Sequence, residues 1–94
     1  INGAEVQTSD PLALAQRWGQ VLQEDYYVDH GVPKIPTLDG PVRFIEPFDG
    51  RPEGLGGIDL KVRDRVALLM HAEALGLPHA EDMIEISGLR FYLV

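Results

Sequence analysis

The sequence predicts an α+β domain that contains one β-α-β-β unit written twice. Two observations lead to this prediction. Alternating apolar and polar residues, then an aspartate, then a helix-like pattern occur both in Glu5–Leu14 and in Ile58–Leu69. Each copy is later followed by a strand-like segment in which a glycine precedes an Arg-Phe pair, at Arg43-Phe44 and at Arg90-Phe91. Asp10 therefore aligns with Asp64, and Arg43 with Arg90.

Length and composition indicate a single domain over residues 1–94, with module one at 1–47, a linker at 48–56 and module two at 57–94. The absence of cysteine excludes disulfides, zinc–thiolate sites and thiol catalysis. A net charge of −7 without a Lys/Arg cluster disfavours nucleic acid as a partner. No apolar run is long enough to span a membrane, and no signal peptide is visible. A small secreted domain would often use disulfides, so the lack of cysteine leads us to expect a cytoplasmic protein.

Module one is expected to begin with a half-buried strand, because residues 4–8 alternate between apolar and polar side chains. Asp10 then suits a helix N-cap, since its carboxylate can accept hydrogen bonds from first-turn amides. Pro11 suits the first helical position, where no amide is needed, and the helix should reach about Leu22. Its apolar stripe should contain Leu14, Ala15, Trp18, Val21 and Leu22. We expect Trp18 to pack in the core.

The rest of module one should hold a loop and two strands. Residues 23–31 are expected as a loop and 32–38 as an edge strand, because Pro33 and Pro36 cannot donate to a sheet ladder. A hairpin turn at Asp39-Gly40 should lead into a strand over 42–46.

Module two should repeat this plan after the Gly- and Pro-rich linker. A strand over 58–62 should precede Asp64, which caps a helix that ends near Leu75 before Gly76. The helix is expected to bury Val66, Leu69, Met70, Ala74 and Leu77. After a loop at 77–82, strands are expected over 83–86 and 89–94.

The tandem pattern resembles the glyoxalase-like domains of the vicinal oxygen chelate superfamily, most of all in Thr8–Trp18 and Gly54–Val62. The resemblance implies two βαβββ modules paired into a curled, mostly antiparallel sheet, with helices on the convex face and a ligand on the concave face. The sequence indicates three strands per module. Either a fourth strand lies in the linker and the first loop, or the domain is abbreviated.

Enzymes of that superfamily hold a divalent metal with His or Glu side chains from the first and last strands of each module. The matching positions here are Gly3, Gly57, Arg43 and Arg90. Glycine offers no ligand atom, and arginine does not lose its proton to become a ligand. We therefore expect no metal, no cofactor and a disfavoured catalytic role, and we assign no catalytic residue.

The alternation also predicts which side chains face the concave side. If Val6 and Leu60 pack on the helices, their polar neighbours should face away from them. The candidate ligand-binding residues are Glu5, Gln7, Arg43, Asp59, Lys61, Arg90 and Tyr92. In one interpretation the arginines bind an anion through their planar guanidiniums. In the other, each acid pairs with an arginine, and these pairs fill the concave face. Both interpretations place Glu5, Asp59 and the two arginines near one another.

The histidines do not form a ligand motif. His71 should lie on an exposed helix face, and His30 and His79 in helix-to-strand loops. The Tyr26-Tyr27 pair fits plain packing as well as a ligand mouth or a subunit contact.

Three functions remain open at the level of sequence. The first is a metal-free glyoxalase-like domain that binds a small, anionic ligand or serves as an assembly module. The second is a metal-dependent lyase, isomerase or dioxygenase whose ligands come from elsewhere. The third is an interaction domain with a ferredoxin-like arrangement and no concave ligand-binding face. The short chain and the Pro-marked edge strand favour a homodimer, or pairing with a missing part of a longer chain.

Overall fold

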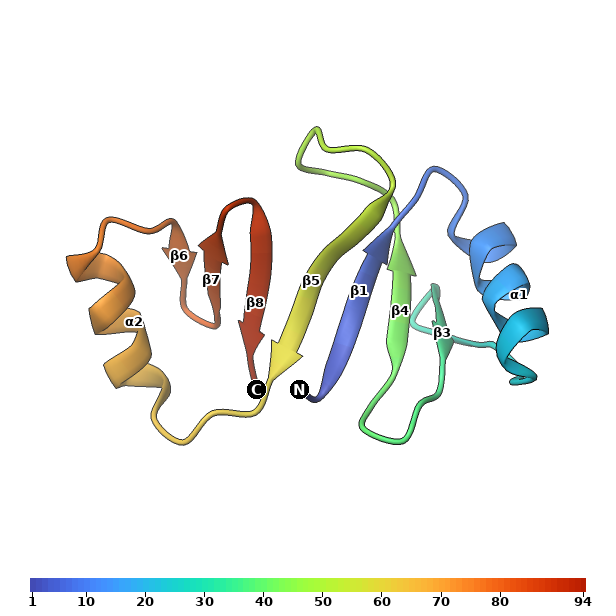
Figure 1. Ribbon diagram of the computed structural model, residues 1–94, viewed down its shortest axis with the longest axis horizontal. Coiled ribbons are helices and arrows are strands. Elements are labelled where there is room, and N and C mark those ends of the chain that lie inside the picture. Colours follow the sequence, from blue (N-terminus) through green and yellow to red (C-terminus); the bar gives the residue numbers. More distant parts are fainter.

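The computed structural model describes residues 1–94, and it confirms the α+β class: two helices pack on one open sheet of eight strands (Figure 1). The first module contains β1 (Gly3–Gln7), α1 (Pro11–Leu22), β2 (Tyr27–Asp29), β3 (Val32–Ile35) and β4 (Val42–Ile45). The second contains β5 (Gly54–Leu60), α2 (Arg65–Ala74), β6 (His79–Ala80), β7 (Met83–Ile86) and β8 (Leu89–Leu93). No helix is long and apolar enough to cross a membrane.

The strand order is β2-β3-β4-β1-β5-β8-β7-β6. Replacing each strand by its equivalent in the other module gives the same order in reverse. The first strand of each module lies parallel to the last strand of that module, and the other neighbours are antiparallel. In Figure 1, β1 and β5 meet in the middle of the sheet, and the helices lie toward its two ends. The chain therefore has two equivalent halves joined along one strand pair.

The register of β1 with β5 shows the internal repeat directly. Gly3 pairs with Asp59, and Glu5 pairs with Gly57. Aligning Asp10 with Asp64 makes Gly3 equivalent to Gly57 and Glu5 equivalent to Asp59, so each pair maps onto the other. The pseudo-twofold axis passes between Ala4 and Ile58. The predicted repeat is confirmed for the strand and helix of each module.

Both helices lie on the same face of the sheet. In module one, Val6 and its neighbour Phe44 pack with helix residue Ala15. In module two, Ile84 and Leu93 pack with helix residue Ala72. The registers of β1, β5 and β8 place these strand residues on one face, because alternate residues of a strand point the same way. The opposite face, which we call the helix-free face, carries the polar residues.

Trp18 packs in the first core, as expected. Its ring meets Phe44 edge to face, with centroids 5.2 Å apart, a favourable arrangement for aromatic pairs. The aspartate caps are also confirmed: Asp10 accepts from the Ala13 amide, and Asp64 accepts from the Ala67 amide.

Four sequence expectations about strands are corrected by the structure. The fourth strand of each module lies at the sheet edge, as β2 within the expected loop 23–31 and β6 within the expected loop 77–82. These edge strands are short, so they carry little alternation. β3 ends at Ile35, just before Pro36. β5 begins at Gly54, inside the stretch expected as a linker, because three of its first four residues are glycines that give no periodic signal.

The predicted helix stripes are partly wrong. Val21 of α1 is 75% exposed, and Val66 and Met70 of α2 are 67% and 65% exposed. Helix α2 packs on the sheet through Leu69, as expected, and through Ala72, which was not in the predicted stripe. The alignment of Phe44 with Phe91 is also wrong by two residues. The strand registers make Phe44 equivalent to Leu93 and Arg43 equivalent to Tyr92.

Candidate functional site

The predicted polar residues meet on the helix-free face around the β1–β5 seam. Glu5 pairs in register with Arg43 on β4, and Asp59 pairs with Tyr92 on β8. Arg90 lies two residues before Tyr92 and therefore points to the same face. Four central strands from both modules thus bring their polar side chains to one place.

Arg43 joins the two acids of the seam. Its Nη1 and Nη2 atoms donate to the two carboxylate oxygens of Asp59 at 2.6 and 2.8 Å. Its Nε atom donates to Glu5 Oε2 at 3.1 Å. The guanidinium also lies over the Tyr92 ring, 5.0 Å from its centroid. The predicted contact between this arginine and the acids is confirmed.

Arg90 is more deeply enclosed, with a side chain that is 3% exposed. Its Nη2 atom donates to Glu5 Oε1 at 2.8 Å and to Gln7 Oε1 at 3.2 Å. Its Nε atom donates to the Tyr92 hydroxyl at 3.0 Å, and that hydroxyl donates to Glu5 Oε1. A guanidinium buried in this way is stable only if its donors find partners, and Glu5 supplies the central one.

A third acid, Asp49, comes from the β4–β5 connection, which we call the covering loop (residues 46–53). Its Oδ2 atom accepts from Arg90 Nη1 at 2.5 Å and from Arg51 Nε at 2.9 Å. Its Oδ1 atom accepts from the Arg51 amide at 3.0 Å and from Gln7 Nε2 at 3.2 Å. Phe48 of the same loop lies over the Arg90 guanidinium, 4.3 Å from ring centroid to carbon.

The electrostatics of this cluster follow from these contacts. Burial opposes the charge of Arg43, but hydrogen bonds and charge from Asp59 and then Glu5 outweigh burial and raise its pKa. The same balance, with Glu5 first among the partners, raises the pKa of Arg90. The Arg51 amide, followed by the side chains of Arg51 and Arg90, lowers the pKa of Asp49. Burial, then the Glu5 charge, raises the pKa of Tyr92.

The cluster balances its own charges. Three guanidiniums pair with three carboxylates through the contacts Arg43–Glu5, Arg43–Asp59, Arg51–Asp49, Arg90–Glu5 and Arg90–Asp49. No buried side-chain nitrogen or oxygen in the chain lacks a hydrogen-bond partner. An anion that enters this face must therefore exchange with a carboxylate that is already there.

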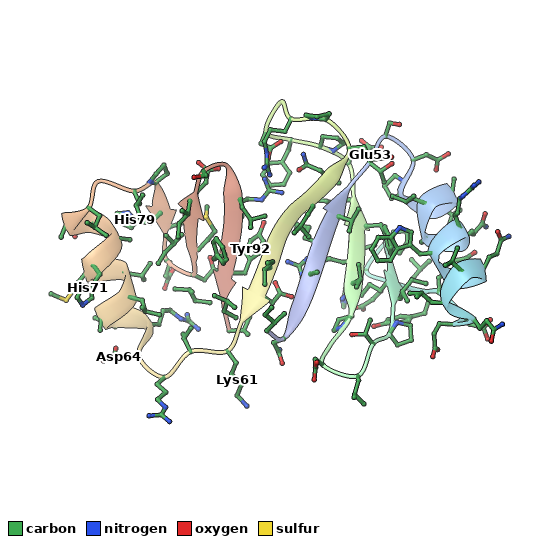
Figure 2. All side chains as sticks on the ribbon, in the orientation of Figure 1. Glu53, Lys61, Asp64, His71, His79 and Tyr92 are labelled. Atoms are coloured by element: carbon green, nitrogen blue, oxygen red, sulfur yellow. The ribbon has the colours of Figure 1, made fainter.

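Lys61 does not join the cluster. It follows the last residue of β5, is exposed, and extends away from the sheet in Figure 2. Its repeat equivalent, Gln7, is buried because the covering loop lies over that end of the sheet, where Gln7 donates to Pro52 O at 3.0 Å. The loop covers one end only, so the two equivalent positions have different surroundings.

The glycines at the first-strand positions are close to their neighbours. A Cβ at Gly57 would lie 2.7 Å from the Tyr92 ring, and a Cβ at Gly3 would lie 2.6 Å from Asp59 Oδ2. Both distances are shorter than van der Waals contact. The Tyr92 ring and the Asp59 carboxylate therefore occupy the space that a metal-ligating side chain at these positions would need.

His, Asp and Glu side chains do not form any group of three or more that could hold a metal ion. His30 and His79 are exposed and contact Asp29 and the Leu77 carbonyl, respectively. His71 lies exposed on α2, and Figure 2 shows it and His79 far from Tyr92. The three histidines are not brought together.

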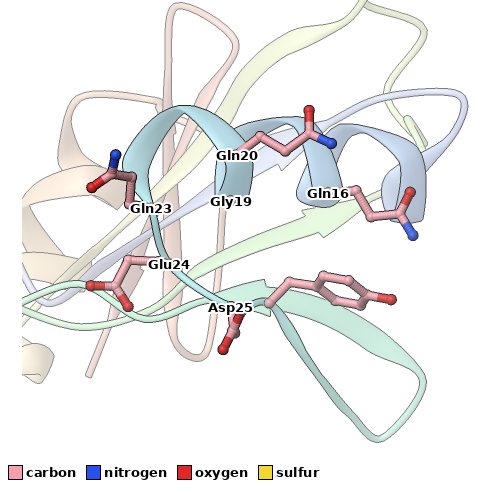
Figure 3. Close-up of a pocket in the computed structure, with 7 residues that line it drawn as sticks. Gln16, Gly19, Gln20, Gln23, Glu24 and Asp25 are labelled. Atoms are coloured by element: carbon pink, nitrogen blue, oxygen red, sulfur yellow. The ribbon is translucent and has the colours of Figure 1, made fainter.

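The hollows of the surface lie outside the cluster. One of about 520 Å³ lies between the end of α1 and the segment before β2, and polar side chains line it (Figure 3). Others lie along α1, around the start of α1, and between α2 and β6. Glu5, Arg43, Asp59 and Arg90 line none of these, because they fill the helix-free face themselves.

Sequence reasoning missed Asp49, Phe48 and Arg51. They lie in a Gly- and Pro-rich stretch that indicates a linker, and their contacts depend on a long-range fold. The signal that could have found them was chemical: an aspartate and an arginine two residues apart, next to a phenylalanine, in the segment that joins the two modules.

No protein-family model matches the chain, and no curated protein matches its sequence significantly. A hypothetical protein from Bacillus halodurans C-125 superposes with a TM-score of 0.68 at 8% identity, over 100% of this chain and 93% of that one. A variant of methylmalonyl-CoA epimerase from Streptomyces coelicolor, in complex with 2-nitronate-propionyl-CoA, superposes with a TM-score of 0.58 at 14% identity, over 99% and 94%. These likenesses show the fold, which is of the vicinal-oxygen-chelate type.

Proposed function

We propose that this domain of vicinal-oxygen-chelate type is a metal-independent, non-catalytic binding module for a small acidic ligand. One observation carries the proposal. On the helix-free face, where the resemblance would place the metal, Arg43 and Arg90 stand with their guanidiniums engaged by Glu5, Asp59 and Asp49.

The charges and the space on the helix-free face both disfavour a divalent cation. A metal would meet two fixed positive charges, and the carboxylates that could bind it already serve those charges. Gly57 cannot be exchanged for a ligand side chain without moving Tyr92. The same two arginines suit a carboxylate, because a guanidinium matches the planar geometry of that group.

Metal analysis of the purified, tag-free protein tests the first half of the proposal. We expect less than stoichiometric Mn, Fe, Ni or Zn, and no anomalous scattering near Arg43 and Arg90 in crystals soaked with Mn²⁺ or Ni²⁺. A metal bound at full occupancy by strand side chains would overturn the proposal. It would favour a metal-dependent lyase, isomerase or dioxygenase instead.

Ligand binding is tested by NMR on the guanidinium Nε–H signals of Arg43 and Arg90. Short monocarboxylates such as acetate and propionate should shift these signals in a saturable manner at constant ionic strength. Chloride at matched ionic strength is the control. If no carboxylate moves either signal, the binding function is excluded.

A second candidate function is assembly, and the surface of α2 favours it. Val66 and Met70 lie one helical turn apart, both are more than half exposed, and they line the hollow beside β6 with Leu69. Exposed apolar side chains grouped in this way are typical of interaction surfaces. Light scattering at micromolar concentration tests the idea: a dimer that a Val66→Ser, Met70→Ser variant loses would support it, and a compact monomer would contradict it.

A further inference from the structure

We propose that Asp49 acts as an internal ligand, whose carboxylate occupies a subsite for a monocarboxylate under the covering loop. The inference deepens the proposed function and rests on it. It states where the acidic group of a ligand binds and what the ligand must displace. The subsite is formed by Arg90 and Gln7, which belong to the sheet, while its present occupant belongs to the loop.

The sheet residues of this subsite are already organised to receive a carboxylate. The side chain of Arg90 is 3% exposed, and Gln7 is 1% exposed. Their Nη1 and Nε2 atoms lie 2.5 Å and 3.2 Å from the two different oxygens of Asp49. Contacts within the sheet hold both side chains in place, since Arg90 also binds Glu5 and Tyr92, and Gln7 Oε1 accepts from Arg90 Nη2.

Asp49 reproduces what a free acid would present. Beyond its Cβ, its side chain is a carboxylate with two oxygens, each of which meets one donor from the sheet. An acetate or propionate group in the same orientation would keep both of these contacts. It would lose only the contacts that Arg51 of the loop makes.

The loop is attached to the sheet in a way that allows displacement. Its hydrogen bonds with the sheet are polar contacts at its surface: Asp49 binds the subsite, Glu53 accepts from the Thr8 hydroxyl, Pro52 O accepts from Gln7 at 3.0 Å, and Arg51 donates to the Gly56 carbonyl at 3.4 Å. Phe48 is 66% exposed even though it lies over Arg90. Figure 1 shows the loop rising beyond the end of β4 and β5, away from both helices. Opening it would uncover little apolar surface, so the hydrophobic part of the cost of opening is small, and a bound carboxylate would replace the contacts of Asp49 with the sheet.

The charges of the subsite select for a single negative charge. Arg90 already serves Glu5 through Nη2, and that carboxylate lies on the far side of the same guanidinium. A monocarboxylate restores the balance that Asp49 provides. A dianion such as phosphate would place an additional negative charge near Glu5 and would be repelled.

The test compares acetate binding by wild type, Asp49→Ala and Asp49→Asn, by thermal shift and by the Arg90 Nε–H signal in NMR. Asp49→Ala should lose stability in chloride and regain it saturably in acetate or propionate. Its acetate Kd should be lower than that of wild type by about tenfold or more, because the tethered Asp49 competes at high effective concentration. Phosphate at equal ionic strength should restore less of the lost stability of Asp49→Ala. The control variant Asp39→Ala, which removes an exposed loop acid, should have the stability and acetate affinity of wild type.

A second pair of variants keeps the inference falsifiable if Asp49→Ala folds poorly. Asp49→Asn keeps the shape of the side chain without its charge, and it should also bind acetate more tightly than wild type. Adding Gln7→Leu to Asp49→Asn should weaken acetate several-fold. Equal acetate affinity in wild type and both Asp49 variants, or no acetate effect in any of them, would overturn the inference. If Arg43 signals still respond to carboxylates, the proposed function survives that result.

Discussion

Arg43 of β4 holds both carboxylate oxygens of Asp59 on β5, at 2.6 and 2.8 Å, and so connects the two modules by a two-point contact. Such a contact fixes the orientation of both groups as well as their distance. It also explains why charged side chains can lie at the β1–β5 seam, because the carboxylate of each module pairs with a guanidinium from another strand.

This two-point contact predicts that lysine cannot replace Arg43. Arg43→Lys keeps the charge but loses the fork, so the free energy of unfolding should fall by about 1–2 kcal/mol. Arg43→Met leaves Asp59 buried without a partner and should cost about 3–5 kcal/mol. Urea denaturation measures both values. Arg65→Lys, on the exposed start of α2, is the control, and an Arg43→Lys variant as stable as wild type would contradict the prediction.

The two helix caps should contribute similar amounts to the free energy of unfolding. Ala13 N donates to Asp10 at 3.2 Å, and Ala67 N donates to Asp64 at 3.0 Å. Replacing either aspartate by alanine should lower the free energy of unfolding by about 1 kcal/mol. Thermal or urea unfolding is the measurement, with Asp39→Ala as the matched change outside a helix. No loss in either variant would count against the caps.

Gly57 should be intolerant of any side chain as long as Tyr92 is present. Its Cβ would lie 2.7 Å from the Tyr92 ring and 3.1 Å from the Arg90 carbonyl. Gly57→Ala should therefore cost about 1–3 kcal/mol. In a Tyr92→Ala background the same change should cost clearly less. Equal costs in the two backgrounds would show that the ring is not the obstacle.

Tyr92 should ionise late and set an alkaline limit to stability. Burial first, and then the Glu5 charge, raises the pKa of its phenol above the ordinary value of 10.0. A group whose folded pKa is raised contributes stability that is complete below its unfolded pKa and is lost as the pH rises through the folded pKa. Tyrosinate absorbance near 295 nm should show a late-titrating group that Tyr92→Phe removes. The stability of wild type should fall above about pH 10, and that of Tyr92→Phe should fall less.

The repeat, both helices and most of the cluster could be predicted from local patterns. Capping aspartates and apolar–polar alternation depend on nearest neighbours in sequence, so Asp10, Asp64, Glu5 and Asp59 were found. The arginines were placed on the correct face although their repeat alignment was wrong. The correct equivalent of Arg43 is Tyr92, two positions from Arg90, and a shift of two residues in a strand preserves the face.

Three features depend on tertiary structure that leaves no local pattern in the sequence: the position of Lys61, the contacts of Asp49 and strand β6. Lys61 was placed in the cluster because the repeat was treated as symmetric, whereas the covering loop encloses only the Gln7 end. Asp49 lies in a Gly- and Pro-rich stretch that indicates a linker, so its contacts were not predicted. Strand β6 contains only two residues, too few for any alternation, and its pairing with β7 alone defines it.

The separation of the two hydrophobic cores has a consequence for how the chain unfolds. Ala15, Ile35 and Phe44 form one buried cluster, and Ala72 and Leu93 belong to another that does not merge with it across the seam. Cooperativity between the halves must then come from the backbone ladder of β1 with β5 and from the ion pairs above it. High salt or loss of Arg43 should make each half open on its own, and amide hydrogen exchange should resolve two opening events in place of one.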